Sequence, residues 1–306
     1  MTAQLPLVSI LIPAYNSRFF EESLSSAVNQ DYSNLEIIVC DDAPGPDIAG
    51  ICKRIGDGRT TYIKNPRNLG FAGNFTECFN RAAGKYIKFL NDDDALLPTC
   101  VSRMVEEFEK HGRELNLVTS RRRVIDEHNK ICRDIPETMP LTCVTSYMEG
   151  TELGDFVLEH SGNFIGEPTT VMFRKEDVDL HGRHLFVLNG NEYLCLADLS
   201  LWLRLLSRGG ALYIAQPMSL YRIHPGQEQA KQYIGVKCIS ERLSIVLDAS
   251  ALGFLKSAER YDEAMRTVGK MVHHSFMDSR FDSDAKEKLR ELKSKIPAEY
   301  LPAPGG

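Results

Sequence analysis

Three consecutive carboxylates follow a short apolar segment in the first third of the chain. Residues 85–98 read KYIKFLNDDDALLP, so a buried strand is predicted to end at Asn91-Asp92-Asp93-Asp94. Adjacent carboxylates repel and raise each other's pKa unless a positive charge lies among them. Carboxylate oxygens are ligands that Mg²⁺ and Mn²⁺ prefer. Helix capping would explain one or two of these acids, so we interpret all three together as a metal or ligand site.

The preceding elements would bring further polar groups to the same place. Strands are predicted at residues 7–13, 35–40, 60–64 and 86–90, and helices at 17–30, 48–55 and 75–83, with a glycine-rich loop at 68–74. Alternating strands and helices predict an open, mostly parallel α/β sheet. Ligands bind such sheets at the carboxyl ends of the strands. Asn16, the Asp41–Asp42 pair and Asn91–Asp94 follow three of these strands, so we expect them to share one site.

The second half has a more mixed pattern. Arg121–Arg123 at the end of a predicted strand is typical of a solvated face. Strands are predicted at 115–124, 169–174 and 211–223, the last broken at Pro217, and helices at 97–112, 151–160, 196–208, 229–247, 261–279 and 283–294. Asp198 lies near the start of the 196–208 helix. Without further evidence, an aspartate at this position is more often an acid that stabilises a helix N-terminus than a catalytic base.

Composition limits the function classes. The chain has 306 residues, 43% hydrophobic, and a formal net charge of −6, which allows a large core and argues against a nucleic-acid partner. The eight cysteines include no C-x-x-C pair, which favours a reducing compartment. The first residues lack a basic segment, and no apolar run reaches the length of a membrane span. We therefore expect a cytoplasmic protein, with peripheral contact at the inner face of the membrane and a homodimer left open.

Six blocks, taken together and in this order, resemble the GT-A family 2 of inverting glycosyltransferases. They are VSILIPAYN, IIVCDDA, NLGFAGN, KFLNDDDALLP, LADLSLWLRL and SLYRIHPGQ, and they cover roughly residues 5–228. The resemblance implies a GT-A fold in which residues 1–98 bind the nucleotide-sugar and residues 99–228 bind the acceptor and carry out catalysis. The helical pattern of residues 229–306 predicts a C-terminal extension outside the resemblance.

The resemblance also implies roles for individual residues. Asp198 matches the catalytic base, and Asp93 matches the metal ligand, with His224 completing the metal shell. Nucleotide contacts are implied for Pro13, Tyr15, Asn16, Asp41, Asp42, Asn68, Gly70, Asn74, Asp92 and Arg222, the last near the diphosphate. Glu167 and Trp202 are weaker candidates for acceptor contacts, and Trp202 is more typical of a core. Asn91 and Ala197 replace acids that are usual in the family.

The predicted reaction moves a sugar from a nucleotide-diphospho-sugar, with UDP favoured, to a hydroxyl of a saccharide or lipid-linked saccharide. Such a role belongs to surface polysaccharide or glycan assembly. Mn²⁺ or Mg²⁺ at Asp93 would neutralise the leaving diphosphate, and Asp198 would accept the hydroxyl proton. A non-catalytic glycosyltransferase-like binding domain stays open as an alternative. A sugar-phosphate nucleotidyltransferase is disfavoured because Pro13-Ala14-Tyr15-Asn16 stands where those enzymes have a glycine-rich loop. A dehydrogenase is disfavoured for want of the glycine fingerprint.

Overall fold

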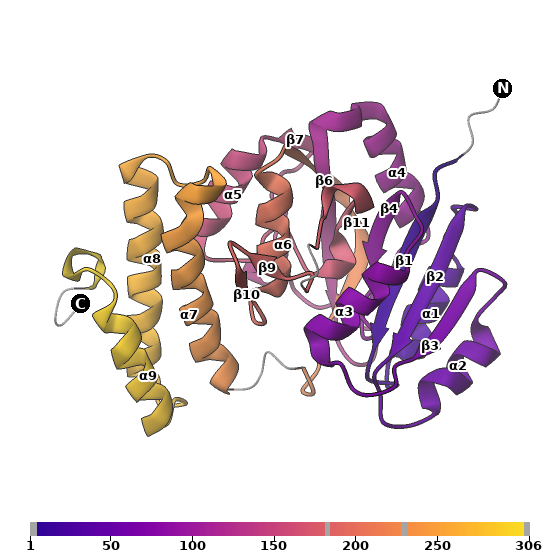
Figure 1. The fold of residues 1–306 in the computed structure, drawn as a ribbon, viewed down its shortest axis with the longest axis horizontal. Coiled ribbons are helices and arrows are strands. Elements are labelled where there is room, and N and C mark those ends of the chain that lie inside the picture. The colour runs from indigo at the N-terminus through magenta and orange to yellow at the C-terminus, as the bar shows by residue number, and fades with distance from the viewer. Residues whose placement is uncertain (1–4, 181–183, 228–231, 303–306) are drawn as a thin grey trace.

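A mixed sheet of nine strands forms the centre of the molecule in the computed structural model, which describes residues 5–180, 184–227 and 232–302 (Figure 1). The strands are β1 Val8–Ala14, β2 Leu35–Asp41, β3 Thr60–Lys64, β4 Tyr86–Phe89, β5 Ala95–Leu96, β6 Leu115–Ile125, β7 Ser146–Met148, β8 Met172–Arg174 and β11 Gly210–Arg222, with a separate pair β9 Val187–Leu188 and β10 Asn191–Glu192. The helices are α1 Phe20–Val28, α2 Asp47–Ile55, α3 Gly70–Arg81, α4 Cys100–His111, α5 Gly150–His160, α6 Ala197–Leu206, α7 Gln232–Asp248, α8 Ala258–Met277 and α9 Ser283–Ser294.

The strand order places the predicted site residues at one edge of this sheet. The order is β3-β2-β1-β4-β8-β6-β11-β5, with β7 paired to β11. Strands β1 to β4 are parallel, β8 is antiparallel to both β4 and β6, and β11 is parallel to β6. The carboxyl ends of β1, β2, β4, β6 and β11 therefore meet at the same edge, where ligands bind in open α/β sheets.

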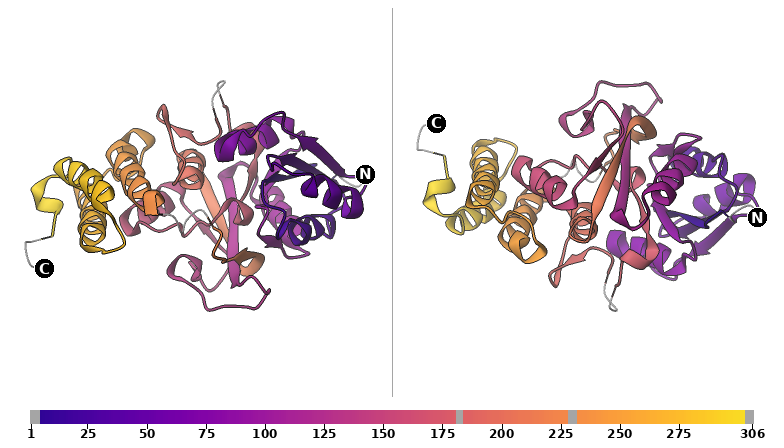
Figure 2. Two further views of the ribbon diagram at one scale, coloured as in Figure 1. Left: turned by 90° about the horizontal axis from the view of Figure 1, so that it is seen from below. Right: turned by 90° about the horizontal axis from the view of Figure 1, so that it is seen from above.

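Two hydrophobic cores cover the two faces of the sheet. In β1, Ile10 and Ile12 pack in the core formed with α1, α2 and α4, whereas Leu11 packs in the core formed with α3, α5 and α6. This alternation follows from the two-residue period of a strand. Helices α7, α8 and α9 extend the core that contains Leu11, and they lie at the end of the molecule opposite β3 (Figures 1 and 2).

Two predicted elements differ from the structure. Helix α3 begins at Gly70 rather than at Phe75, because the Asp42 carboxylate accepts the N–H groups of Leu69 at 2.8 Å and Gly70 at 2.9 Å. These groups would otherwise be unsatisfied at the helix start. The predicted break at Pro217 is instead a pair of register shifts within the continuous strand β11. The predicted 229–247 helix is described from Gln232 onward, and its first residues lie outside the described ranges.

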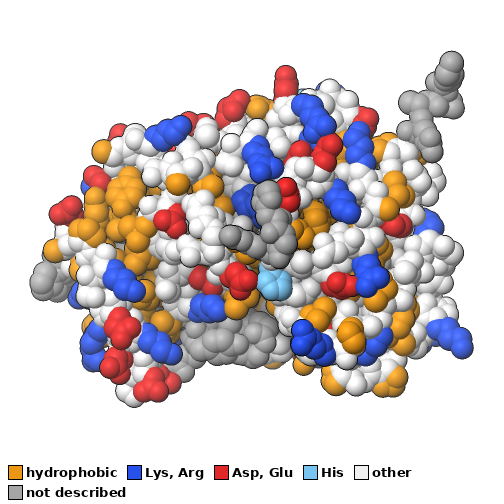
Figure 3. All heavy atoms as spheres, viewed as in Figure 1, with side chains coloured by type: hydrophobic (Ala, Val, Ile, Leu, Met, Phe, Trp, Pro, Cys, Tyr) orange, Lys and Arg blue, Asp and Glu red, His pale blue; other side chains and the backbone are white. Residues whose placement is uncertain are grey.

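The C-terminal helices are joined to the rest of the chain by a disulfide between Cys195 and Cys238, whose Cα atoms are 5.2 Å apart. The expectation of reduced thiols is therefore wrong for this pair. The six other cysteines are free. Across the parts of the chain that the structure describes, no helix has both the length and the hydrophobicity of a membrane span. Figure 3 shows hydrophobic side chains gathered over α7 and α8, with acidic and basic side chains interspersed elsewhere on this face.

The surroundings of two glycines predict opposite effects of a glycine-to-alanine substitution on stability. A Cβ on Gly154 of α5 would lie 2.2 Å from Cε1 of Phe254, whose ring is fully buried. We expect Gly154→Ala to lower the free energy of unfolding by about 1–3 kcal/mol through overpacking. A Cβ on Gly50 of α2 would meet no described atom within 4 Å, so Gly50→Ala should raise it by about 0.5–1 kcal/mol. Urea unfolding measures both, and a stabilised Gly154→Ala protein would contradict this packing.

Candidate functional site

The three consecutive carboxylates after β4 point toward three different surroundings. Oδ2 of Asp92 accepts the backbone N–H groups of Tyr15 and Asn16, both at 2.7 Å. Burial raises the pKa of Asp92 to about 6, although these two hydrogen bonds act in the opposite direction. The Asp93 side chain is 24% exposed and faces His224. Asp92 thus fixes the turn after β1, and Asp93 is the acid that remains open to a ligand.

Asp94 is directed into the protein interior. Its Oδ2 accepts hydrogen bonds from Thr169 Oγ1 at 2.7 Å and Asn91 Nδ2 at 3.1 Å, and its Oδ1 accepts the backbone N–H of Arg222 at 3.0 Å. Burial raises the pKa of Asp94 well above its usual range. Asp94 therefore joins β4 to β11 and to the loop before β8. It does not add a third carboxylate to a common metal site, as the sequence pattern suggested.

Asp93 and His224 form the one pair of predicted metal ligands that the structure brings together. His224 Nε2 lies 3.3 Å from Oδ2 of Asp93, and His224 packs against the Phe19 ring. His224 Nδ1 is 3.2 Å from the backbone nitrogen of Gly226. Because that nitrogen is a donor, Nδ1 accepts, and the neutral ring carries its proton on Nε2. A cation at Nε2 would require the other tautomer and would break the contact to Gly226.

The donor chemistry of this pair fits a divalent cation. Within the described ranges, no group of three or more His, Cys, Asp or Glu side chains gathers around a common centre. Mg²⁺ is commonly bound by one or two carboxylates together with substrate phosphates rather than by an all-protein cage. Asp93 and His224 would supply the protein part of such a shell.

Arg222 is not available for a diphosphate, which corrects the sequence prediction. Its side chain is 0% exposed and its guanidinium stacks 4.4 Å from the Phe19 ring centroid. Its donors bind Asp93 O at 2.7 Å, Asp126 O at 3.1 Å, Asn129 Oδ1 at 2.7 Å and Glu22 Oε2 at 2.6 Å. Arg222 thus fixes the backbone that carries Asp93, and it acts through structure rather than by contact with a ligand.

Asp41 and Asp42 are also occupied by partners within the chain. Asp41 is fully buried and accepts hydrogen bonds from the Tyr62 hydroxyl at 2.7 Å and the Ala43 N–H at 2.8 Å. Asp42 binds the start of α3 and accepts Asn65 Nδ2 at 2.7 Å. Both acids shape the edge of the sheet, and in this structure neither presents a free carboxylate to a nucleotide.

Other residues predicted to touch the nucleotide are structural as well. Asn74 is buried in α3, where its Nδ2 donates to Ala14 O at 3.3 Å and Cys40 O at 3.1 Å, so it ties together the ends of β1 and β2. Pro13 is buried within β1. Asn68 is exposed and its Oδ1 accepts the Gly70 N–H at 2.7 Å. Of these, Asn68 and Gly70 remain accessible at the surface.

A cavity of about 380 Å³ opens beside the ends of β1 and β2. It is lined by Tyr15, Asn16, Ser17, Ala43, Pro44, Gly45, Asp47 and Ile48. Tyr15 is 57% exposed. Among the described residues its lining includes neither Asp41 nor Asp42. The cavity therefore offers an aromatic ring, backbone groups and Asp47 to a ligand, and Asp47 gave no motif signal in the sequence.

Asp198 lies at the start of α6 with both carboxylate oxygens in hydrogen bonds. Asn163 Nδ2 donates to Oδ2 at 2.6 Å, and the Leu199 N–H donates to Oδ1 at 2.7 Å. Burial raises the pKa of Asp198 to about 6, and the Glu167 carboxylate acts in the same direction, while the Arg122 guanidinium opposes it. A carboxylate with such a pKa is ionised at neutral pH and is basic enough to accept a proton.

Arg122 and Glu167 form an ion pair beside Asp198 that the sequence did not predict. Arg122 is buried rather than solvated, and its Nε lies 2.7 Å from Glu167 Oε2 in an ion pair. Arg122 Nη2 also donates to Asn163 O at 3.0 Å. Glu167 therefore has a partner inside the chain and is not a free acceptor contact. A block of three arginines on one strand carries no signal that only the middle one is buried.

The loop around Gly166 connects Asp198 to the Asp94 region. Trp202 is 1% exposed and its Nε1 donates to Gly166 O at 2.9 Å, so it is a core residue and not an acceptor contact. Gly166 has φ +110°, and a Cβ there would lie 2.1 Å from Thr170 Oγ1. Because Asn163 at one end of this loop binds Asp198 and Thr169 at the other binds Asp94, the loop holds both acids at the same edge of the sheet.

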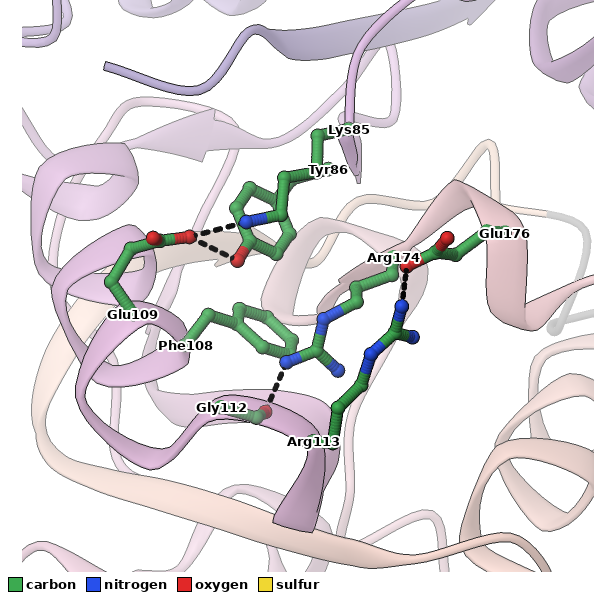
Figure 4. Close-up of a pocket in the computed structure, with 8 residues that line it drawn as sticks. All are labelled: Lys85, Tyr86, Phe108, Glu109, Gly112, Arg113, Arg174 and Glu176. Atoms are coloured by element: carbon green, nitrogen blue, oxygen red, sulfur yellow. Dashed lines mark hydrogen bonds and ion pairs between the residues drawn. The ribbon is translucent and has the colours of Figure 1, made fainter. Parts of the chain in front are cut away.

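A smaller cavity of about 170 Å³ lies at the opposite edge, beside the amino end of β4 (Figure 4). Lys85 and Tyr86 both donate to Glu109 Oε1, at 2.7 Å and 2.6 Å, and Arg113 is 2.6 Å from Glu176. Arg174 donates to Gly112 O. Because these charges are satisfied by one another, we assign no ligand to this cavity.

Comparisons with known proteins identify the family. The family described as Glycosyl transferase family 2 matches residues 9–179. An uncharacterized protein of Mycobacterium tuberculosis, MT1568, is 28% identical over 222 residues, which are 71% of this chain and 67% of that protein. The Escherichia coli enzyme WfaP, named UDP-Glc:alpha-D-GlcNAc-diphosphoundecaprenol beta-1,3-glucosyltransferase, is 39% identical over 106 residues. That segment is 34% of this chain and 42% of WfaP.

A solved structure confirms the predicted fold. Staphylococcus aureus TarS, residues 1–349, in complex with UDP-GlcNAc superposes with a TM-score of 0.69 at 14% identity, covering 96% of this chain and 81% of that chain. The GT-A expectation, a large sheet flanked by helices with a helical C-terminal region, is therefore confirmed. At this identity the likeness concerns the fold alone.

The position of Arg222 predicts a loss of stability from a substitution that keeps its charge. Lysine cannot reproduce the planar fork that binds four acceptors, so Arg222→Lys should lower the free energy of unfolding by about 3 kcal/mol. Arg67→Lys, at an exposed position, is the control and should change it by less than about 0.5 kcal/mol. Denaturant unfolding followed by circular dichroism measures both. Normal stability with weakened nucleotide binding would instead restore the diphosphate assignment for Arg222.

Proposed function

The chain belongs to glycosyl transferase family 2, and we propose that it is an inverting enzyme that moves a sugar from a UDP-sugar to a hydroxyl group of a saccharide acceptor. The name of WfaP gives a UDP-linked donor and a diphosphoundecaprenol-linked acceptor, and TarS was solved with UDP-GlcNAc. These relatives support UDP as the nucleotide and a lipid-linked glycan or related polymer as the acceptor. Because the match covers less than half of WfaP, the donor sugar and acceptor are proposals for this chain.

The observation that carries the proposal is a cavity, a pair of metal-ligand side chains and a buried acid that meet at one edge of the sheet. The cavity beside Tyr15 and Asn16 has about the volume of a small-molecule ligand site. Asp93 and His224 approach each other near the carboxyl end of β4, and Asp198 lies beyond the loop that binds Asp94. Along this edge the nucleotide cavity comes first, the metal ligands come next and the base comes last. A nucleotide-sugar and an acceptor would be bound in the same order.

Asp93 and His224 would hold Mn²⁺ or Mg²⁺ together with the donor diphosphate. When bound, the cation supplies positive charge that stabilises the negative charge developing on the leaving nucleoside diphosphate. Arg222 contributes by fixing the Asp93 backbone through its hydrogen bond to Asp93 O.

Asp198 is assigned the role of general base. The acceptor hydroxyl would form its bond to the anomeric carbon while the bond from that carbon to the diphosphate oxygen breaks. The hydroxyl proton passes to Asp198, and the nucleoside diphosphate leaves with the electron pair of the broken bond. A single displacement of this kind inverts the anomeric centre. Asn163 and the Leu199 N–H hold the carboxylate in place for this transfer.

The alternative of a non-catalytic binding domain differs from this proposal in one measurable respect. Both would bind a nucleotide at the cavity beside Tyr15, but only the enzyme needs Asp198 for turnover. The family match gives no support to a nucleotidyltransferase.

We expect calorimetry to detect binding of UDP, and not of GDP or dTDP, in Mn²⁺ and little binding in EDTA. Asp93→Ala should weaken binding in Mn²⁺ by about 100-fold, because a bound cation contributes several kcal/mol to charge neutralisation. Asp284→Ala, in the exposed first turn of α9, is the matched control and should bind normally. Tight binding of UDP by Asp93→Ala, or equal binding in EDTA, would refute the metal assignment. Preference for GDP or dTDP would correct the donor nucleotide.

Asp198→Asn should retain UDP binding and lower kcat by about 10²–10⁴-fold, because the amide cannot accept the hydroxyl proton. In the unmodified enzyme, kcat/KM should fall about tenfold per pH unit below about 6, where Asp198 becomes protonated, and should be flat above it. Asp92 also has a pKa of about 6, so Asp92→Asn is the control and should keep this dependence. Normal turnover by Asp198→Asn in a radiolabelled-sugar assay would show that the base lies elsewhere.

A further inference from the structure

One face of helix α7 lies along residues 191–196, the segment that leads from β10 into α6. The contacts, taken along α7, are the disulfide of Cys238 with Cys195, the 3.3 Å contact of Ser244 Oγ with the Tyr193 hydroxyl, and the 3.4 Å hydrogen bond from Asn191 Nδ2 to the Asp248 carboxylate. Positions three or four residues apart share one side of a helix. Because residues later in α7 contact residues earlier in the segment, the helix and the segment run antiparallel.

Glu241, in the middle of this face, binds the end of the segment that is nearest to α6. Its Oε1 accepts the backbone N–H of Leu194 at 3.1 Å, and its Oε2 accepts those of Cys195 at 2.9 Å and Leu196 at 2.8 Å. Glu241 is 8% exposed, and a buried N–H group that loses its acceptor is costly. A negative charge at the start of a helix is also favoured by the helix dipole. The carboxylate therefore fixes three consecutive peptide groups immediately before α6.

Asp198 depends on this start of α6 for the position of its main chain. It is the second residue of the helix and follows Leu196 by two residues. Leu196 O accepts the N–H of Ser200 at 2.9 Å, which joins the fixed peptide groups to the first turn. The Asp198 side chain is held separately, by Asn163 Nδ2 at 2.6 Å. The carboxylate thus has two supports: the loop before β8 orients its side chain, and Glu241 holds the backbone from which it extends.

We propose that Glu241 is a positioning residue for Asp198, through which α7 of the C-terminal extension sets the distance between the base and the acceptor hydroxyl. The role of Asp198 rests on the proposed function, whereas the attachment of α7 to the start of α6 does not. A general base acts only within hydrogen-bond reach of the proton that it accepts, and a misplacement of about 1 Å can lower a rate about 100-fold. The extension is then part of the catalytic apparatus and acts through the main chain.

Two substitutions at Glu241 test the proposal by their effects on turnover. Glu241→Ala removes all three acceptors and should lower kcat by about 10- to 100-fold, with UDP binding in Mn²⁺ unchanged. Glu241→Gln keeps one oxygen, which can still accept from Cys195 and Leu196, so kcat should recover to within about fivefold of the unmodified enzyme. Unchanged kcat in Glu241→Ala, or equal losses in the two variants, would overturn the proposal.

Asp155→Ala is the matched control for a general loosening of the extension. Asp155 on α5 is also 8% exposed, and it accepts the backbone N–H of Leu255 at 2.7 Å and Arg260 Nη1 at 2.9 Å. Its removal should lower Tm, as Glu241→Ala does, and leave kcat unchanged at temperatures well below Tm. If kcat falls in step with Tm in both variants, Glu241 acts through stability alone and the proposal is overturned.

The kinetic effect should also disappear when the base is absent. In an Asp198→Asn background, Glu241→Ala should lower the residual kcat by less than about twofold, because two substitutions that act on one interaction are not additive. A full 10- to 100-fold loss in that background would show that Glu241 acts elsewhere, and the assignment to Asp198 would be wrong.

Hydrogen exchange of the backbone amides, followed by NMR of the full chain, tests the attachment without any transfer reaction. The amides of residues 194–196 should exchange slowly although the Leu194 residue is 48% exposed. Glu241→Ala should speed their exchange about 10-fold or more, and Asp155→Ala should leave it unchanged. If these results hold but no transfer is detected, the proposed function fails and the attachment stands. Rapid exchange of these amides in the unmodified chain would overturn the proposal, even if Glu241→Ala did not fold.

Discussion

The cost of removing carboxylates from water governs the architecture of this site. Six acids gather at the carboxyl edge of the sheet, from the ends of β2 and β4 and the start of α6, and five of them, all but Asp93, accept hydrogen bonds from backbone, hydroxyl or amide donors in another part of the chain. Because like charges in a poorly hydrated region destabilise each other, the acids point apart. The donors that satisfy them are mostly backbone N–H groups and amide side chains, which fix the turns and helix starts around the site.

This arrangement divides the acids into two classes. Asp41, Asp42, Asp92 and Asp94 bind partners within the chain and set the positions of strands, turns and helices. Asp93 keeps its carboxylate next to His224 at the surface of the edge. Asp198 is held by Asn163 yet has a pKa near neutrality because it is buried. The chemistry of the site therefore depends on which acids are not used to hold strands, turns and helices in place.

The connections between distant parts of the chain make the site a single unit. Arg222 at the end of β11 ties Asp93 and Asp94 to α1 through Glu22. The loop from Asn163 to Thr169 spans the interval between Asp94 and Asp198, and Glu241 fixes the entry to α6 from the C-terminal extension. The geometry at the edge thus relies on hydrogen bonds that join residues far apart in the chain.

Sequence alone determined the alternation of strands and helices, the fold class, and the edge at which the polar groups meet, because these follow from local periodicity and from residues at strand ends. It also predicted Asp93 and His224 as metal ligands and Asp198 as the base, and these roles stay predictions. It placed the start of α3 wrongly, because the groups that begin this helix are satisfied by Asp42 of another element. It took Arg222 for a ligand contact and Arg122 for a solvated side chain, and it attached no role to Asn163 or Glu241. The direction and burial of a side chain depend on its neighbours in space, and only the tertiary structure decides which polar groups are consumed by the fold and which remain for chemistry.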